Sequence, residues 1–416
     1  MLGALVLALV GCSPAGDDAG STATPSSARA VAPSASGTSS ASSAADAART
    51  DPAARRAAVE ALLSERASAF VTGDLRRAKA TQVPGAVVPT SARIVELPLA
   101  SWSYAVTSAT EKSGLLDVRA DLTWQLEGES SGSVLRERIA LRWSGGRWLL
   151  ASEKSTADAP PPWELGNLTV ARGTSSIVIA IGGSASRART AAGLVDRAVT
   201  GVSAVYGDDW RRRAVLVITG TDQQMASGLG WSVERVRDVG AVTTSVGSLE
   251  SATAPADRVW TRASLWTRLP ERYRLVLLRH ELTHVATRAT FSATVPLWLE
   301  EGYADHVGYT GSGVPLEQSV VELLDVVRGS GAPRSLPTDA DFRGSGVGAA
   351  YAGGHLACEI LADRWGEAGL RRVYRLTATG EAEPARNLER ALREVTGAGL
   401  ATLTATWRAR AQELAR

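Results

Sequence analysis

The chain has 416 residues, of which 44% are apolar and 21% are charged, which is enough for two or three ordinary domains. A formal net charge of +2 gives no reason to expect a nucleic-acid partner, because that would require clustered basic residues. Two cysteines exclude a disulfide framework as the source of stability. No apolar run reaches the roughly 18 residues of an ordinary transmembrane helix.

The N-terminus carries a short apolar run from Leu2 to Val10, which suits the hydrophobic region of a signal peptide. It ends in Leu-Val-Gly-Cys at Cys12, which resembles a bacterial lipobox. The resemblance implies that residues 1–12 are a lipoprotein signal, and that a lipid on Cys12 anchors the protein to the extracytoplasmic face of the cell membrane. Residues 13–50 are mostly small and polar, so we expect a disordered tether there. The alternative is an apolar strand with an incidental cysteine.

Residues 51–157 predict a first folded domain. Helical spacing from Asp51 to about Thr81 is followed by alternation from 93 to 152, which predicts an antiparallel meander. A helix followed by a sheet that ends in Gly-Gly-Arg-Trp-Leu-Leu resembles the nuclear-transport-factor-2-like fold, which implies a curved, cone-like sheet. No group of acids, histidines or cysteines stands out in this segment. We therefore expect an accessory or targeting domain.

A Pro-rich segment, 158–166, predicts a stiff, extended linker to a second domain, 167–416. The patterns that follow predict a mixed sheet and then a mostly helical half from about 269, which makes the whole chain an α+β protein. The expected strands are 168–171, 177–181, 214–218, 241–246 and 257–265, and the expected helices before the helical half are 187–205 and about 221–227.

The strongest motif is His280-Glu281-Leu282-Thr283-His284, inside a predicted helix from 272 to 288. Two histidines one turn apart can bind one zinc ion, and the glutamate between them can polarise a water on the metal. The motif uses two of only four histidines in the chain. The plain alternative is a helix with two surface histidines.

A second motif, Leu297-Trp-Leu-Glu-Glu-Gly-Tyr-Ala-Asp305, resembles the "WLxEGxA" segment of the gluzincin metallopeptidases, the clan that includes thermolysin. The resemblance implies a thermolysin-like domain, one zinc per chain, and Glu301 as the third ligand. Glu300 is the rival, but it lies about 100° around the helix from Glu301. Asp305 is placed to accept a hydrogen bond from a ligand histidine, or it is a solvated carboxylate.

The same resemblance implies two further features. Substrate would lie along an edge strand before the active-site helix, and 257–265 is placed for that role. Aminopeptidases of the clan carry a "GxMEN" motif there, and the lack of Met or Glu between 252 and 270 favours an endopeptidase. Tyr351 is the first candidate for the residue that stabilises the oxyanion of the reaction, and His355 is the second. The alternative is that both side chains belong to the core. Cys358 is read as a small buried hydrophobe.

Together these motifs predict a membrane-anchored zinc metallopeptidase that acts on peptide or protein substrates. His280, His284 and Glu301 would hold the zinc, and Glu281 would act as general base on the zinc-activated water. Two alternatives stay open: a catalytically silent binding lipoprotein with the same fold, and a zinc amidase that acts on cell-wall material. The sequence leaves the oligomeric state open.

Overall fold

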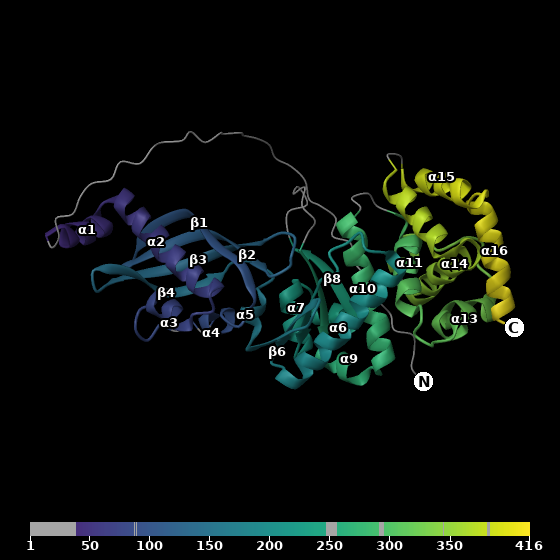
Figure 1. The fold of residues 1–416 in the computed structure, drawn as a ribbon, viewed down its shortest axis with the longest axis horizontal. Helices are drawn as coiled ribbons and strands as arrows, with labels where there is room; N and C mark the ends of the chain where they lie inside the picture. The colour runs from purple at the N-terminus through teal and green to yellow at the C-terminus, as the bar shows by residue number, and fades with distance from the viewer. Residues whose placement is uncertain are drawn as a thin grey trace.

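The computed structural model describes residues 39–416 apart from 87, 89, 247–255, 291–294, 344 and 381–382. Figure 1 shows an antiparallel sheet at one end of an elongated molecule, a mixed sheet in the middle and a group of helices at the other end. None of the described helices is long and apolar enough to span a membrane. The signal segment and Cys12 lie outside the described residues, so the lipobox remains a prediction.

The N-terminal region contains the predicted meander, with strand order β1-β2-β3-β4 and every neighbouring pair antiparallel. Inward-facing positions of β2 are buried and alternate with more exposed ones, as expected for a sheet with one face against helices. The elements are α1 (Ser39–Thr50), α2 (Pro52–Val71), α3 (Leu75–Ala80), α4 (Thr90–Ile94), β1 (Leu99–Lys112), β2 (Leu115–Leu126), β3 (Ser133–Ser144) and β4 (Arg147–Ser155).

Two expectations for this region are corrected. Residues 39–50, expected to be part of a disordered tether, form α1, and Trp148 Nε1 donates a hydrogen bond to Ala48 O at 2.9 Å. The long helix expected from 51 to 81 is broken into α2 and α3. Gly73 has a φ of 66°, and Asp74 caps α3 by accepting a hydrogen bond from the Arg77 backbone N–H.

The central sheet has the strand order β5-β6-β7-β9-β8. Strands β6, β7 and β9 are parallel to one another, and the edge strands β5 and β8 run antiparallel to their neighbours. Every residue of β6 and β7 is buried, because both faces of the sheet are covered. The elements are α5 (Pro162–Leu165), β5 (Leu168–Arg172), β6 (Ser176–Ile181), α6 (Ala185–Tyr206), β7 (Ala214–Thr219), α7 (Asp222–Leu229), α8 (Val233–Arg237), β8 (Ala241–Val246), β9 (Ala256–Arg262) and α9 (Ala263–Arg268).

The segment 257–265, expected to be an edge strand for substrate, is placed differently. Strand β9 ends at Arg262, and the chain continues as α9. In the sheet, β9 lies between β7 and β8, so its backbone is paired on both sides. The edge strand that precedes the helix of the His280–His284 motif is β8. It was predicted as a strand, but its place at the edge depends on pairing that sequence patterns do not show.

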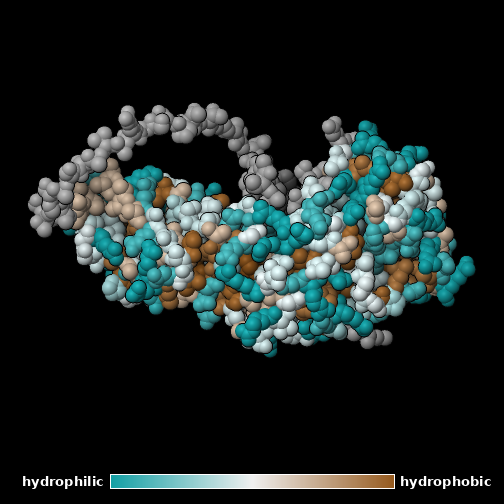
Figure 2. All heavy atoms as spheres, in the orientation of Figure 1, coloured by the Kyte–Doolittle hydropathy of each residue, from teal (hydrophilic) through white to brown (hydrophobic). Residues whose placement is uncertain are grey.

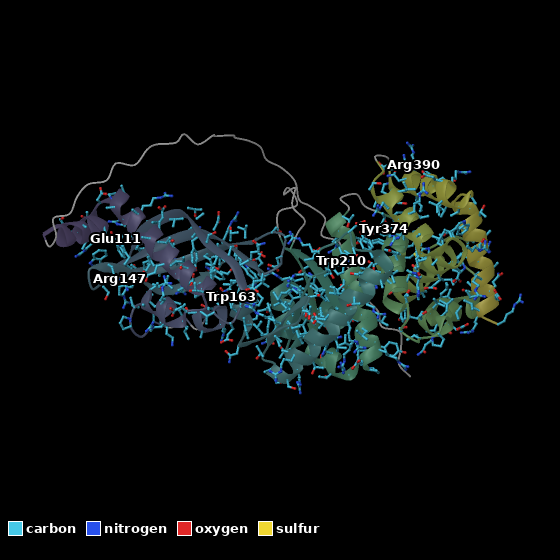
Figure 3. All side chains as sticks on the ribbon, in the orientation of Figure 1. Glu111, Arg147, Trp163, Trp210, Tyr374 and Arg390 are labelled. Atoms are coloured by element: carbon cyan, nitrogen blue, oxygen red, sulfur yellow. The ribbon has the colours of Figure 1, made fainter. Side chains whose placement is uncertain are left out.

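The two sheets share one hydrophobic core. Trp163 lies at the junction (Figure 3), with its ring centroid 5.1 Å from that of Trp102 and 4.8 Å from that of Trp124. These tryptophans belong to the same buried cluster as Trp260 of β9. The segment 158–166 is therefore not the extended spacer that its prolines suggested, because α5 inserts Trp163 into the core.

A buried ion pair reinforces this junction. Arg258 of β9 binds Glu129 of the β2–β3 turn, with 2.7 Å between Nε and Oε1, and both side chains are almost fully buried. The guanidinium also lies 4.0 Å from the ring centroid of Trp124. Together with the shared core, this contact joins the N-terminal region and the central sheet into one packed unit.

The rest of the chain is helical, as predicted: α10 (Glu271–Thr290), α11 (Leu297–Tyr309), α12 (Leu316–Ser319), α13 (Val321–Ser330), the 3₁₀ turn η1 (Asp341–Arg343), α14 (Val347–Ala378), α15 (Pro384–Thr396) and α16 (Leu400–Leu414). Helices α11 and α14 approach closely, since a Cβ on Gly302 would lie 2.3 Å from the Gly354 carbonyl. Helix α14 kinks at Gly366, where φ is 71°. On the face seen in Figure 2, hydrophobic residues are interspersed among hydrophilic ones.

Candidate metal centre

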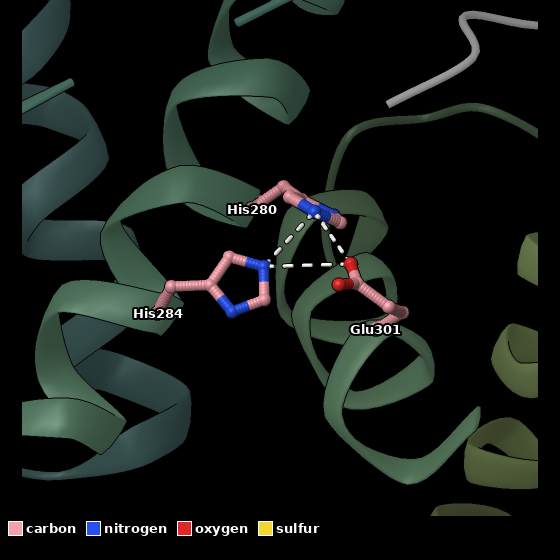
Figure 4. A group of neighbouring side chains, drawn as sticks. All are labelled: His280, His284 and Glu301. Carbon is pink, nitrogen blue, oxygen red and sulfur yellow. Dashed lines mark hydrogen bonds and ion pairs between the residues drawn. The ribbon is translucent and has the colours of Figure 1, made fainter. Parts of the chain in front are cut away.

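Helices α10 and α11 bring His280, His284 and Glu301 together (Figure 4). The two His Nε2 atoms are 3.2 Å apart. Glu301 Oε2 lies 3.3 Å from His280 Nε2 and 3.5 Å from His284 Nε2. All three residues are buried, with at most 2% of their surface exposed. The histidines meet because positions i and i+4 share one helix face, and α11 crosses that face.

This triangle fits a tetrahedral zinc ion. Metal–ligand bonds of about 2.0–2.2 Å place the ligand atoms of a tetrahedral site about 3.3–3.6 Å apart, close to the 3.2–3.5 Å seen here. Glu301 Oε2 is buried and has no hydrogen-bond partner, a costly arrangement unless a cation uses its lone pair. Two imidazole nitrogens and one carboxylate oxygen are a donor set typical of catalytic zinc, with a further position open.

Asp305 fixes the orientation of His280. Its Oδ1 lies 2.8 Å from His280 Nδ1, and because a carboxylate can only accept, Nδ1 carries a proton and donates it, which leaves Nε2 to bind a cation in the triangle. Asp305 itself is 5% exposed, unlike a solvated helix carboxylate. Burial lowers the pKa of His280, but Asp305 and Glu301 outweigh burial and raise that pKa well above its usual value. Such a strongly negative surrounding favours a bound cation.

Glu300, the rival third ligand, lies on the outer side of His284. Its Oε1 is 3.6 Å from His284 Nδ1, beyond hydrogen-bond distance, and 24% of its side chain is exposed. The group of mutually close ligand atoms contains Glu301 and not Glu300. The helical rotation between neighbouring residues therefore separates the two glutamates as expected.

Glu281, which lies between the two histidines in the sequence of α10, is also buried, with 0% of its surface exposed. Its Oε2 accepts a hydrogen bond from Thr243 Oγ1 at 2.6 Å, and its Oε1 has no hydrogen-bond partner. A buried carboxylate with one free oxygen next to a cation site is suited to accept a proton. The sequence predicted Glu281 as the general base, but it contains no signal for Thr243, which lies 38 residues earlier on β8.

The two oxyanion candidates have different surroundings. The Tyr351 ring centroid lies 6.3 Å from that of His280 and 5.2 Å from that of Phe342. His355 instead directs Nε2 toward Glu359 Oε1 at 3.1 Å and stacks on Tyr309 with centroids 5.0 Å apart. Its nitrogens are not part of the close ligand group. The arrangement favours Tyr351, which lies next to a ligand histidine.

A second histidine–carboxylate cluster, which the sequence did not indicate, joins α11 to α14. His306 Nδ1 lies 2.6 Å from Glu359 Oε1, and His306 Nε2 lies 2.9 Å from both oxygens of Glu367. Burial lowers the pKa of His306, but the two carboxylates outweigh it and raise the pKa to about 9. His306 thus binds carboxylates on both sides of the Gly366 kink. Its partners are more than 50 residues away, so only the tertiary structure reveals the cluster.

A third buried polar group lies in the N-terminal region, where none was expected. Arg66 Nη2 binds Glu153 Oε2 at 2.6 Å, and Tyr104 donates to the other oxygen of Glu153 at 2.5 Å. Glu137 is 3% exposed and its Oε2 has no hydrogen-bond partner. Burial and the charges of Glu153 and Glu164 raise the pKa of Glu137 to about 9, so it is protonated at neutral pH. No signal local in sequence joins these residues.

No family model matches the chain. No curated protein matches it either. Among solved structures, similar chains include an M1 zinc metallopeptidase from Deinococcus radiodurans, crystallised as a glutamate-to-alanine mutant, with a TM-score of 0.36 and 17% identity over 74% of this chain and 60% of that one. Another is a two-domain M1 zinc metallopeptidase mutant bound to L-arginine, with a TM-score of 0.36 and 16% identity over 76% of this chain and 61% of that one.

These matches span about 60% of the length of the M1 structures. TM-scores of this size do not establish a common fold. The site geometry therefore carries the functional inference.

Proposed function

We propose that the protein is a zinc-dependent metallopeptidase that hydrolyses peptide bonds, with one zinc per chain held by His280, His284 and Glu301. The observation that supports this most directly is the triangle of ligand atoms, on a helix that also carries the buried Glu281 with one oxygen free of hydrogen bonds. When bound, zinc would supply Lewis acidity and an activated water. Intact ligands together with Glu281 favour an enzyme over a silent binding protein.

The roles of the chain's own residues follow from their positions. Glu281 Oε1 accepts the proton of the attacking water and returns it to the leaving amine. Asp305 keeps the His280 ring in the tautomer that leaves Nε2 free. Tyr351 donates a hydrogen bond to the developing oxyanion. Each role uses a different residue, so each can be tested separately.

We further propose that substrate binds in an extended conformation along β8. In the described part of the chain this strand pairs only with β9, and the substrate backbone would form hydrogen bonds along its other edge. The sequence from Gly240 to Val246, Gly-Ala-Val-Thr-Thr-Ser-Val, contains no acid that could hold the free amine of a substrate. The lack of an acid in this strand supports an endopeptidase, as does the lack of Met or Glu between 252 and 270.

The location of the enzyme is also a proposal, supported by the sequence alone. A lipid on Cys12 would anchor the protein to the extracytoplasmic face of the membrane. We expect a Cys12→Ser variant to leave the membrane fraction, as measured by fractionation and immunoblotting. A variant that stays fully membrane-bound would contradict the anchor.

The proposed reaction is tested by Glu281→Gln, which removes the general base but not a ligand. We expect about one zinc per chain by elemental analysis, with turnover of a cleaved peptide from a mixed library reduced about 100- to 10,000-fold. Glu271→Gln is the matched control on the same helix, because Glu271 is exposed and pairs with Arg197. An undiminished rate in Glu281→Gln would contradict the mechanism.

Two other results would redirect the function. Zinc binding without cleavage of any library peptide, but with release of product from purified cell-wall material, would show the amidase. Wild-type protein without zinc and without activity would show the silent binding protein.

A further inference from the structure

Strand β8 contacts α10 through the side chain of Thr243. Thr243 is 4% exposed, and its Oγ1 lies 2.6 Å from Glu281 Oε2 and 3.1 Å from the Glu281 main-chain oxygen. A hydroxyl has one proton to donate, and a distance of 2.6 Å is typical of a charge-assisted O–H···O⁻ bond. The carboxylate is therefore the principal acceptor.

This bond makes the two oxygens of Glu281 different from each other. Oε2 is occupied by the Thr243 hydroxyl, whereas Oε1 is buried without a hydrogen-bond partner. A glutamate side chain has several rotamers of similar energy, and fixing one of them in solution is costly. With Oε2 held by the strand, the free oxygen has one defined position relative to the histidines.

The same residue is held to the helix through its backbone. Arg288 Nη1 donates to Thr243 O at 3.3 Å, and Arg288 lies two turns after Glu281 on α10. Thr243 is thus connected to two positions of α10, Glu281 and Arg288. Thr243 lies on the strand proposed to bind substrate. Its hydrogen bond to Glu281 therefore also holds the general base at a defined position relative to the substrate backbone.

We propose that Thr243 is a positioning residue, which holds Glu281 in the rotamer that directs Oε1 toward the reacting water. This inference rests on the proposed peptidase function. Strand β8 would then both bind the substrate backbone and orient the general base.

The direct test compares Thr243→Val, which keeps the shape but removes the hydroxyl, with Thr243→Ser, which keeps the hydroxyl. We expect Thr243→Val to lower kcat about 10- to 100-fold, with KM changed less than about twofold, because small displacements of a catalytic group have effects of this size. Zinc content should stay at the wild-type value. Thr243→Ser should recover most of kcat.

Thr377→Val is the matched control. Thr377 is a fully buried threonine of α14, outside the proposed site, and its hydroxyl donates to Val373 O at 2.8 Å. It should keep kcat within about twofold of wild type. A Thr243→Val enzyme with normal kcat, or a Thr377→Val enzyme with an equal loss, would overturn the proposal while leaving the peptidase function intact.

A double-mutant cycle in metal-free protein gives a readout that does not depend on activity. Thr243→Val should lower the Tm of wild-type protein but should have a much smaller effect in a Glu281→Ala background, where the acceptor is missing. Equal Tm losses in both backgrounds would show a merely structural threonine and would overturn the proposal. If no peptide is cleaved by wild type, the peptidase function fails, and this cycle still decides whether the contact holds Glu281.

Discussion

The two histidine–carboxylate clusters of the helical half contain the same kinds of side chain but differ in spacing. In the first, His280, His284 and Glu301 keep their ligand atoms 3.2–3.5 Å apart around a common point. In the second, His306 lies 2.6 Å from Glu359 and 2.9 Å from Glu367, using a different ring nitrogen for each.

The first spacing leaves room for a cation between the atoms, whereas the second is that of charge-assisted hydrogen bonds. The first cluster also has two imidazoles side by side, which is unfavourable unless a metal accepts both lone pairs. In the second cluster, the imidazolium of His306 lies between two carboxylates. Spacing and the order of charges thus separate a metal centre from an ionic contact between helices.

The largest expected effect is the loss of zinc from variants of the first cluster. His284→Ala or Glu301→Gln should reduce the zinc content from about one per chain to near zero, because each removes one of three protein ligands. His355→Gln, which removes an imidazole that contacts Glu359 of the second cluster, should keep about one. Elemental analysis after dialysis measures this, and zinc lost from His355→Gln would show that the second cluster also binds metal.

The next effect is on folding stability. His306→Ala removes the cation between two carboxylates, and we expect it to lower the free energy of unfolding by about 2–3 kcal/mol, somewhat less than for a fully buried pair because Glu367 is 45% exposed. Denaturant unfolding measures the change. Arg372→Ala, which breaks the exposed pair with Glu394, is the control and should cost less than about 1 kcal/mol. Equal losses would mean that His306 contributes no more than a surface pair.

The pH dependence of stability should also distinguish the clusters. The pKa of His306 is raised to about 9, against about 6.5 in the unfolded chain. Its contribution is therefore complete below about pH 6.5 and is lost as the pH rises through 9, which amounts to about 2 kcal/mol between pH 7 and pH 9. A His306→Gln variant should lack this part of the decline. Identical pH profiles for the two proteins would contradict the raised pKa.

The smallest effect is expected for Glu300. Glu300→Gln should change zinc affinity less than about threefold, because Oε1 is 3.6 Å from His284 Nδ1 and the side chain is partly exposed. Asp305→Asn, which weakens a 2.8 Å bond to His280, should cost about 10- to 100-fold. Competition with a chromophoric chelator measures both, and the reverse order would exchange the roles of the two acids.

The features that could be predicted are those encoded over short stretches of sequence. Strand alternation indicated the meander, and the i, i+4 spacing of His280 and His284 placed both on one helix face. Strand order could not be predicted. Which of β8 and β9 lies at the edge of the sheet depends on the strands they pair with, and their composition does not show this. Thr243, His306 and Trp163 were missed for a related reason, since their partners lie 38 or more residues away.

The tryptophan-lined junction between the sheets bears on how the molecule unfolds. An interface that contains Trp163 and the Arg258–Glu129 pair cannot be opened without exposing apolar surface and a desolvated charge on both sides. The two sheets should therefore melt together, as a single cooperative transition in calorimetry. Cleavage of the chain near residue 158 would leave two fragments that remain associated, and neither would be expected to keep its native structure alone.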